Sequence, residues 1–191
     1  MREIRIHGRG GQGSVVTAEL IAIAAYKSGM FSQAFPYLGG GGERRGAPVQ
    51  AFCRIDNSPI QLKCQIKEPD YLIVQDDSLL EIVNIFEGLK PGGMILINSV
   101  KSLSDLGIDF SRFKVHVFPA TEIALKVLNQ PITNTTLMGA FAAITGMLKI
   151  DYFKQAIQEK FSEEVSGANI LAMEEAFRLI NKYEGNTINE A

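Results

Sequence analysis

The chain has 191 residues, of which 46% are hydrophobic, so it is long and apolar enough to form one domain with a sizeable core. Its net charge of −2 and the lack of a basic block argue against a nucleic-acid-binding protein. The longest apolar run, residues 137–148, is too short to cross a bilayer, and the first residues show no signal-peptide pattern. We therefore expect a cytoplasmic location and no membrane partner.

The first half of the chain predicts a strand, a helix and then further strands. Apolar residues recur at helical spacing after the first strand, and Gly29 is well placed to end that helix. The expected elements are a strand at Arg2–His7, a helix at Gly13–Ser28, a strand at Phe31–Tyr37, and a hairpin of Pro48–Ile55 with Pro59–Ile66.

That hairpin determines what is expected of the two cysteines. If Ile55 opposes Ile60, then Cys53 opposes Leu62, and Cys64 is only a diagonal neighbour. A diagonal of about 7–8 Å is long for a disulfide, so we expect two reduced and buried thiols. Two thiols are also too few for an iron–sulfur cluster, and the two histidines lie outside any ligand-spaced cluster, so no metal site is expected.

The second half alternates short apolar runs with helical patterns, which is typical of an α/β fold. The expected elements are strands at Tyr71–Val74, Met94–Asn98 and Val115–Phe118, and helices at Ser78–Glu87, Thr121–Leu128, Thr136–Leu148, Tyr152–Phe161 and Ala168–Tyr183. We predict a Rossmann-like, mostly parallel sheet with helices on both faces, a β-hairpin insertion and a helical C-terminal part. Residues 1–184 are expected to form a single domain, and residues 185–191 a frayed tail.

A glycine-rich turn between the first strand and the first helix is the first candidate site. Gly8, Arg9, Gly10, Gln12 and Gly13 lie in a stretch that fits G-x-G-x-x-G, where backbone amides and the helix dipole favour an anion. We interpret Gly8 as permitting a tight turn, Gly10 a close ligand approach and Gly13 close helix–strand packing. Arg9 could add a charged contact. The alternative is a tight connection that binds no ligand.

A conventional dinucleotide is not expected at this turn. Such a site needs an acidic residue at the end of the second strand, about 20 residues on, to hold the ribose hydroxyls. The predicted second strand, Phe31–Tyr37, contains no Asp or Glu.

A second glycine-rich loop, residues 39–46, follows that strand and carries Glu43, Arg44, Arg45 and Gly46. Four consecutive glycines are entropically costly to hold in one structure, so we expect this loop to serve a partner or a substrate. A pair of guanidinium groups suits bidentate recognition of phosphate or carboxylate. The alternative is a solvated loop whose charges pair with one another.

Other polar residues have simpler interpretations. Asp76 and Asp77 follow a buried strand, where ligands collect in α/β sheets, and could bind a metal or act as acid and base. We favour Asp77 as a helix cap and Asp76 as a loop residue. Asn134 or Thr135 is expected to cap a later helix whose small face allows close packing. The sequence contains no G-x-S-x-G elbow, no Walker loop and no Gly-Asp-Gly start of a thiamine diphosphate motif, so no catalytic residue is assigned.

Taken together, these motifs resemble one known family. The chain is similar to the gamma subunit of 2-oxoacid:ferredoxin oxidoreductases of the pyruvate and 2-oxoisovalerate types, over about Arg2 to Tyr183. The resemblance rests on residues 7–13 (HGRGGQG), 33–36 (QAFP), 42–49 (GERRGAPV) and 51–52 (AF), with weaker likeness at 70–80, 89–100 and 134–146. The run of four glycines departs from the shorter turn that is typical of the family.

The resemblance implies a division of labour. In such enzymes partner subunits of the alpha, beta and delta types bind thiamine diphosphate, Mg²⁺ and the iron–sulfur clusters. The complex converts a 2-oxoacid and coenzyme A to acyl-coenzyme A and CO2 and reduces ferredoxin. This chain then holds no cofactor, and its two glycine loops could face coenzyme A or the active-site entrance. The alternatives are a free-standing nicotinamide or flavin oxidoreductase, and a stand-alone binding module for an anionic metabolite or dinucleotide.

Overall fold

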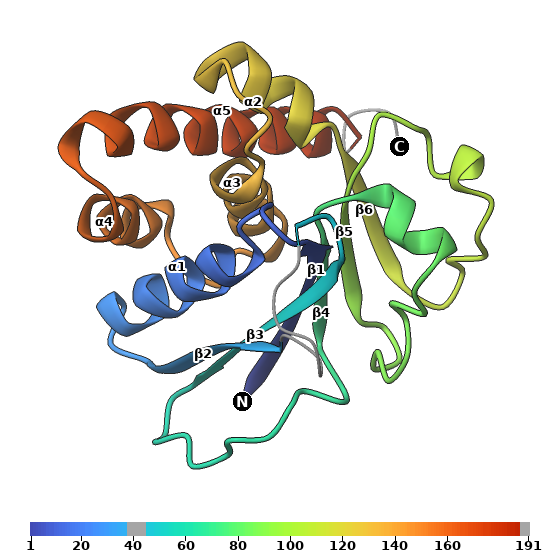
Figure 1. Ribbon diagram of the computed structural model, residues 1–191, viewed down its shortest axis with the longest axis horizontal. Helices are drawn as coiled ribbons and strands as arrows, with labels where there is room; N and C mark the ends of the chain where they lie inside the picture. The colour runs from blue at the N-terminus through green and yellow to red at the C-terminus, as the bar shows by residue number, and fades with distance from the viewer. Residues whose placement is uncertain (38–44, 188–191) are drawn as a thin grey trace.

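The computed structural model describes residues 1–37 and 45–187. The fold is one mixed sheet of six strands with its long helices packed on one face (Figure 1). In chain order the elements are β1 (Arg2–Arg9), α1 (Ser14–Lys27), β2 (Phe31–Tyr37), β3 (Pro48–Asp56), β4 (Tyr71–Val74), the 3-10 helix η2 (Asp77–Glu81), β5 (Met94–Asn98), the 3-10 helix η3 (Ser104–Leu106), β6 (Lys114–Phe118), α2 (Ala120–Leu128), α3 (Asn134–Thr145), α4 (Ile150–Lys160) and α5 (Glu163–Thr187).

The strand order is β2-β3-β1-β4-β5-β6, and the four strands from β1 to β6 along this order are parallel. β3 is antiparallel to both β1 and β2. After β1 the chain forms β2 and β3, which extend the sheet from one edge of β1. It then returns to form β4 along the other edge of β1. The carboxyl ends of β1 and β4 therefore form a topological switch point, the usual ligand position in open α/β sheets. The predicted α/β fold is confirmed.

The two faces of the sheet are covered differently. The helices α1 to α5 lie on one side, where the larger core cluster contains Ile4, Ile6, Leu20 and Phe141 (Figure 1). The other face carries a smaller cluster around Leu72 and is covered by loops and the short helices η2 and η3. The connections between β4, β5 and β6 are thus crossovers without long helices. The predicted helix at Ser78–Glu87 is wrong, because only the five-residue 3-10 helix η2 forms there.

The predicted strand at Pro59–Ile66 is also wrong, because no strand forms between β3 and β4. β1 and β2 occupy both edges of β3, so β3 cannot pair with the segment that follows it. The segment instead covers the buried guanidinium of Arg54, which donates to the carbonyl oxygens of Leu62 (3.5 Å) and Gln65 (3.4 Å).

The positions of the two cysteines differ from expectation because β3 pairs with β1 and β2. Cys53 lies opposite Ile4 and Ala34, not opposite Leu62. Both thiols are free, as expected, and burial raises the pKa of the Cys53 thiol. The expectation of two buried thiols is wrong for Cys64, which is exposed in the segment that follows β3.

The helix starts also differ from expectation. Asp76, not Asp77, caps η2 and accepts a hydrogen bond from the backbone N–H of Ser78. Thr133 is the N-cap of α3, and the Asn134 side chain accepts from the next backbone N–H at 2.8 Å. α5 extends to Thr187, and the expected frayed tail stays a prediction because residues 188–191 lie outside the described part.

Within residues 1–37 and 45–187, no helix is both long enough and apolar enough to span a bilayer.

Candidate functional site

The glycine-rich turn lies between β1 and α1, at the carboxyl edge of the sheet and at its switch point. Gly11 and Gly13 adopt positive φ angles of 93° and 76°, so they carry the tight turn that the sequence analysis assigned to Gly8. Gly8 is required for a different reason. A Cβ there would overlap Ser14 Oγ and Gln75 Oε1.

The second glycine-rich segment is joined to this turn by the backbone. The N–H of Gly10 donates to Ala47 O at 2.8 Å, and the N–H of Gly46 donates to Gly10 O at 3.0 Å. Gly10 and Arg45 form an isolated parallel bridge. Two motifs separated by more than thirty residues are therefore parts of one site. Glu43 and Arg44 lie outside the described residues, and Arg45 is exposed.

Arg9 reinforces this junction with its side chain. It donates to Asp76 Oδ2 at 3.1 Å, Ser78 Oγ at 2.6 Å and Gly46 O at 3.0 Å. Gln12 accepts from the Arg9 backbone N–H at 2.7 Å and donates to Asp76 Oδ2 at 2.9 Å. Arg9 therefore fixes the two segments to each other, and its expected contact with an anion stays a prediction.

The charge of Asp76 is set by opposing effects. Partial burial raises the pKa of its carboxyl. Hydrogen bonds from Ser78 and Gln12, and the positive charge of Arg9, outweigh burial and leave the pKa below its usual value. Asp76 is therefore a carboxylate at neutral pH, and its hydrogen bonds hold neighbouring segments of the chain together.

A polar cleft of about 360 Å³ opens beside this network, above the ends of β4 and β5. Asn98 donates to Gln75 O and to Thr121 Oγ1, both at 2.9 Å, and accepts from the backbone N–H of Thr121. The cleft is lined by Gln12, Gln75, Asp76, Asp77, Asn98, Ser99, Val100 and Thr121. The amides and hydroxyls of this set suit a polar, hydroxyl-bearing ligand group.

Sequence reasoning missed Gln75 and Asn98. Both are buried and each stands at or directly after the last residue of an apolar strand, which is the signal that could have identified them. Ser99 donates to Asp77 Oδ2 at 2.6 Å, so Asp77 belongs to the cleft although it does not cap the helix. Within residues 1–37 and 45–187, no group of three His, Cys, Asp or Glu side chains could hold a metal ion.

His7 and Arg5 form a buried pair on the face of β1 that points away from the helices α1 to α5. Arg5 Nε donates to His7 Nε2 at 3.0 Å, and its other donors reach the carbonyls of Ile85 and Glu87. Burial, with the nearby charge of Arg5, lowers the pKa of His7 to about 3. His7 is thus a neutral structural residue at physiological pH.

Comparison with known proteins adds the decisive observation. The family model described as pyruvate ferredoxin/flavodoxin oxidoreductase matches residues 3–179. The chain belongs to this family. The predicted resemblance to its gamma-type subunits is confirmed by nearly full-length matches to curated members.

Two curated members illustrate that similarity. Pyruvate synthase subunit PorC of Methanocaldococcus jannaschii is 51% identical over 96% of this chain and 99% of its own length. The pyruvate/ketoisovalerate oxidoreductases common subunit gamma of Thermococcus kodakarensis is 47% identical over 96% of this chain and 100% of its own length.

Solved structures of the family share the fold. Pyruvate oxidoreductase subunit PORC of Thermotoga maritima is 34% identical, superposes with a TM-score of 0.79, and the match covers 93% of this chain and 95% of that one. A 2-oxoglutarate:ferredoxin oxidoreductase of Magnetococcus marinus is only 20% identical and has a TM-score of 0.76. It matches 95% of this chain but 31% of its own longer chain, so it shows the fold alone.

Proposed function

We propose that this chain is the gamma subunit of a complex that oxidises pyruvate or a branched-chain 2-oxoacid. The complex converts the 2-oxoacid and coenzyme A to acyl-coenzyme A and CO2, and the two electrons released reduce ferredoxin. Support comes from relatives whose names give them as PorC or as the common gamma subunit, because they match nearly all of the chain. A cytoplasmic location, expected from the sequence, is part of this proposal.

Thiamine diphosphate, Mg²⁺ and the iron–sulfur clusters are assigned to partner subunits of the alpha, beta and delta types. The cysteines of this chain do not fit an iron–sulfur cluster. Burial raises the pKa of the Cys53 thiol, and Cys64 is exposed with its sulfur near the Arg54 guanidinium, so these two thiols cannot supply the four thiolates that a cluster takes. The chain's own contribution is then to shape a binding surface.

We assign that surface to the joined glycine segments, as the place where coenzyme A or the active-site entrance is contacted. The observation that carries this proposal is the backbone bridge of Gly10 to Gly46 and Ala47. It sets the exposed Arg45 beside the N-terminus of α1, whose first turn has no acidic residue. A helix N-terminus next to a guanidinium group favours the phosphates of coenzyme A.

Replacement of both arginines tests this assignment. Arg44→Ala with Arg45→Ala is expected to leave the fold intact and to raise the KM for coenzyme A about tenfold or more, because each charged hydrogen bond contributes about 1.5–3 kcal/mol. The measurement is coenzyme A-dependent viologen reduction by the reconstituted complex at several coenzyme A concentrations.

A matched variant controls for loss of surface charge. Lys63→Ala with Lys67→Ala also removes two exposed cations, but from the segment between β3 and β4. This double variant is expected to have the wild-type KM. An unchanged KM and an unchanged turnover in the arginine variant would contradict the proposed role of the loop.

A further inference from the structure

The strand β6 is the last strand of the sheet, and within residues 1–37 and 45–187 it pairs on one side only, with β5. The N–H of Lys114 donates to Gly93 O, and Phe118 O accepts from the N–H of Ser99, so these two residues bond toward β5. Because bonding residues alternate in a parallel pair, the peptide groups of Val115 and Val117 point away from β5. Among the described residues, the outward peptide groups of Val115 and Val117 therefore have no strand to pair with.

The two edges of the sheet differ in their protection. Natural edge strands are commonly blocked by proline or charge, because an open edge pairs with other chains. At the opposite edge β2 contains Pro36, which has no N–H to donate. β6 (KVHVF) contains no proline, and its only formally charged side chain, Lys114, is at its first position.

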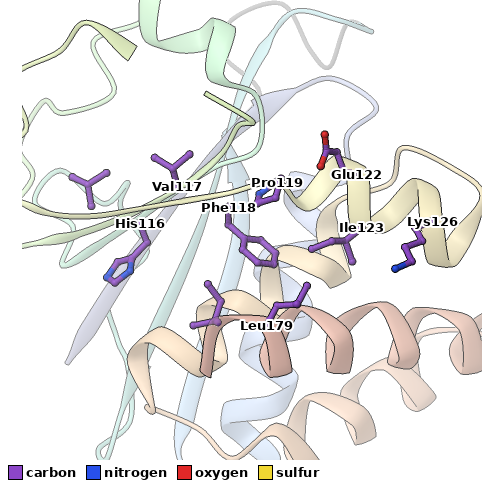
Figure 2. Close-up of a pocket in the computed structure, with 10 residues that line it drawn as sticks. His116, Val117, Phe118, Pro119, Glu122, Ile123, Lys126 and Leu179 are labelled. Atoms are coloured by element: carbon purple, nitrogen blue, oxygen red, sulfur yellow. The ribbon is translucent and has the colours of Figure 1, made fainter. Parts of the chain in front are cut away.

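Apolar hollows lie on both faces of this edge. The helix-side groove, about 610 Å³, lies between β6, α2 and α5; Figure 2 shows His116 and Phe118 of β6 with Ile123 and Leu179 opposite them. The loop-side groove, about 560 Å³, is lined on the other face by residues that include Leu103, Ile108, Phe110 and Phe113. Val115 borders both grooves.

An open strand edge with an apolar groove on each face fits a ligand in the shape of an extended strand. Successive side chains of an extended strand point to opposite faces of a sheet. A strand added to β6 would therefore place alternate side chains in the helix-side groove and the loop-side groove, while its backbone paired with Val115 and Val117. A helix or a small apolar molecule would use one groove and leave the edge unpaired.

The charges at the rim favour acidic residues in that strand. Lys114 begins β6 and Lys126 borders the helix-side groove on α2, and both are exposed. Among the residues that the structure describes, no salt bridge to Lys114 is formed. Lys126 already has acidic neighbours, because Glu122 lines the same groove and the charge of Lys126 helps to lower the pKa of Glu175 on α5.

We propose that β6 accepts an extended segment of a partner subunit as a seventh strand. The segment carries apolar side chains at alternate positions and an acidic residue near Lys114, and binds by strand addition. This inference rests on the proposed function, since it takes the partner from the same complex.

The first test is hydrogen exchange in the assembled complex, read at single amides. The N–H groups of Val115 and Val117 are expected to exchange as slowly as the N–H of His116, which already bonds within the sheet. Exchange as fast as in the exposed turn at residues 101–105 would overturn the proposal.

The second test removes one edge donor. Val117→Pro deletes an N–H that the β5 ladder does not use, and is expected to reduce retention of partner subunits at least tenfold when all chains are co-expressed. Val117→Thr keeps the N–H and the side-chain shape, so it should retain partners as the wild type does. Equal retention by the proline and threonine variants would contradict strand addition.

A second pair of variants covers the case in which the proline variant does not fold. Leu179→Glu places a charge in the helix-side groove and should weaken partner retention, whereas Leu171→Glu alters an exposed position of α5 and should not. If the wild-type chain captures no partner at all, the proposed function fails and this inference fails with it. If partners are captured while the edge amides exchange rapidly, only this inference fails.

Discussion

Asp76 links the two glycine segments, because it accepts hydrogen bonds from Gln12 and Arg9 while Arg9 donates to Gly46. The pKa of its carboxyl lies below the usual value, so the folded chain binds a proton there less readily than the unfolded chain. The charged form consequently stabilises the fold above about pH 4, and this stabilisation is lost as the pH falls through the lowered pKa.

Replacement of Asp76 by Asn should therefore destabilise the chain in a pH-dependent way. The amide keeps one acceptor but turns a donor group toward Arg9 or Gln12, and the free energy of unfolding at neutral pH should fall by about 1–3 kcal/mol. Urea denaturation should show a smaller difference from the wild type at about pH 3, where the carboxyl is also becoming protonated. An equal loss at both pH values would contradict the account.

At the scale of elements, α3 and α5 are held together by a contact that only glycine permits. A Cβ on Gly139 of α3 would overlap the backbone carbonyl oxygen of Met173 in α5. The sequence analysis expected close packing on this small face of the helix, and the partner helix belongs to the same chain. Leu137, Met138 and Ala140 are buried around the contact.

A pair of glycine variants tests this packing. Gly139→Ala forces the two backbones apart and should lower the free energy of unfolding by about 3 kcal/mol. Gly167→Ala, in α5 with no atom within 4 Å of the added Cβ, should raise it by about 0.5–1 kcal/mol, because alanine has the higher helix propensity. Thermal denaturation of both variants decides the matter, and a shift of the same sign in both would be incompatible with the contact.

Six of the seven strands predicted from the sequence form near their expected positions, whereas the pairing of β3 was predicted wrongly. Tyr71–Val74 and Met94–Asn98 are short apolar runs bounded by turn residues, and both strands form with those bounds. Pro59–Ile66 alternates in polarity but forms no strand. Alternation reports which side chains share a face, but it carries no information about which edge of β3 is free.

For the molecule as a whole, the sheet order creates the candidate site. The sequence identified both glycine segments from their composition, but the hydrogen bonds of Gly10 to Gly46 and Ala47 depend on β3 lying beside β1. Gln75 and Asn98 join the site for the same reason, because β4 and β5 end at the same edge. Local patterns could predict the parts of the site, whereas their assembly depends on contacts between distant segments.

Mild affinity purification of this chain from its native host tests the central claim most directly. The eluate would be assayed for viologen reduction that requires both coenzyme A and a 2-oxoacid, and the co-eluting chains would be identified by mass spectrometry. The account predicts a thiamine-binding subunit and a cysteine-rich, ferredoxin-like subunit in an active eluate, and the preferred 2-oxoacid names the substrate. A chain that elutes alone and without activity would contradict it.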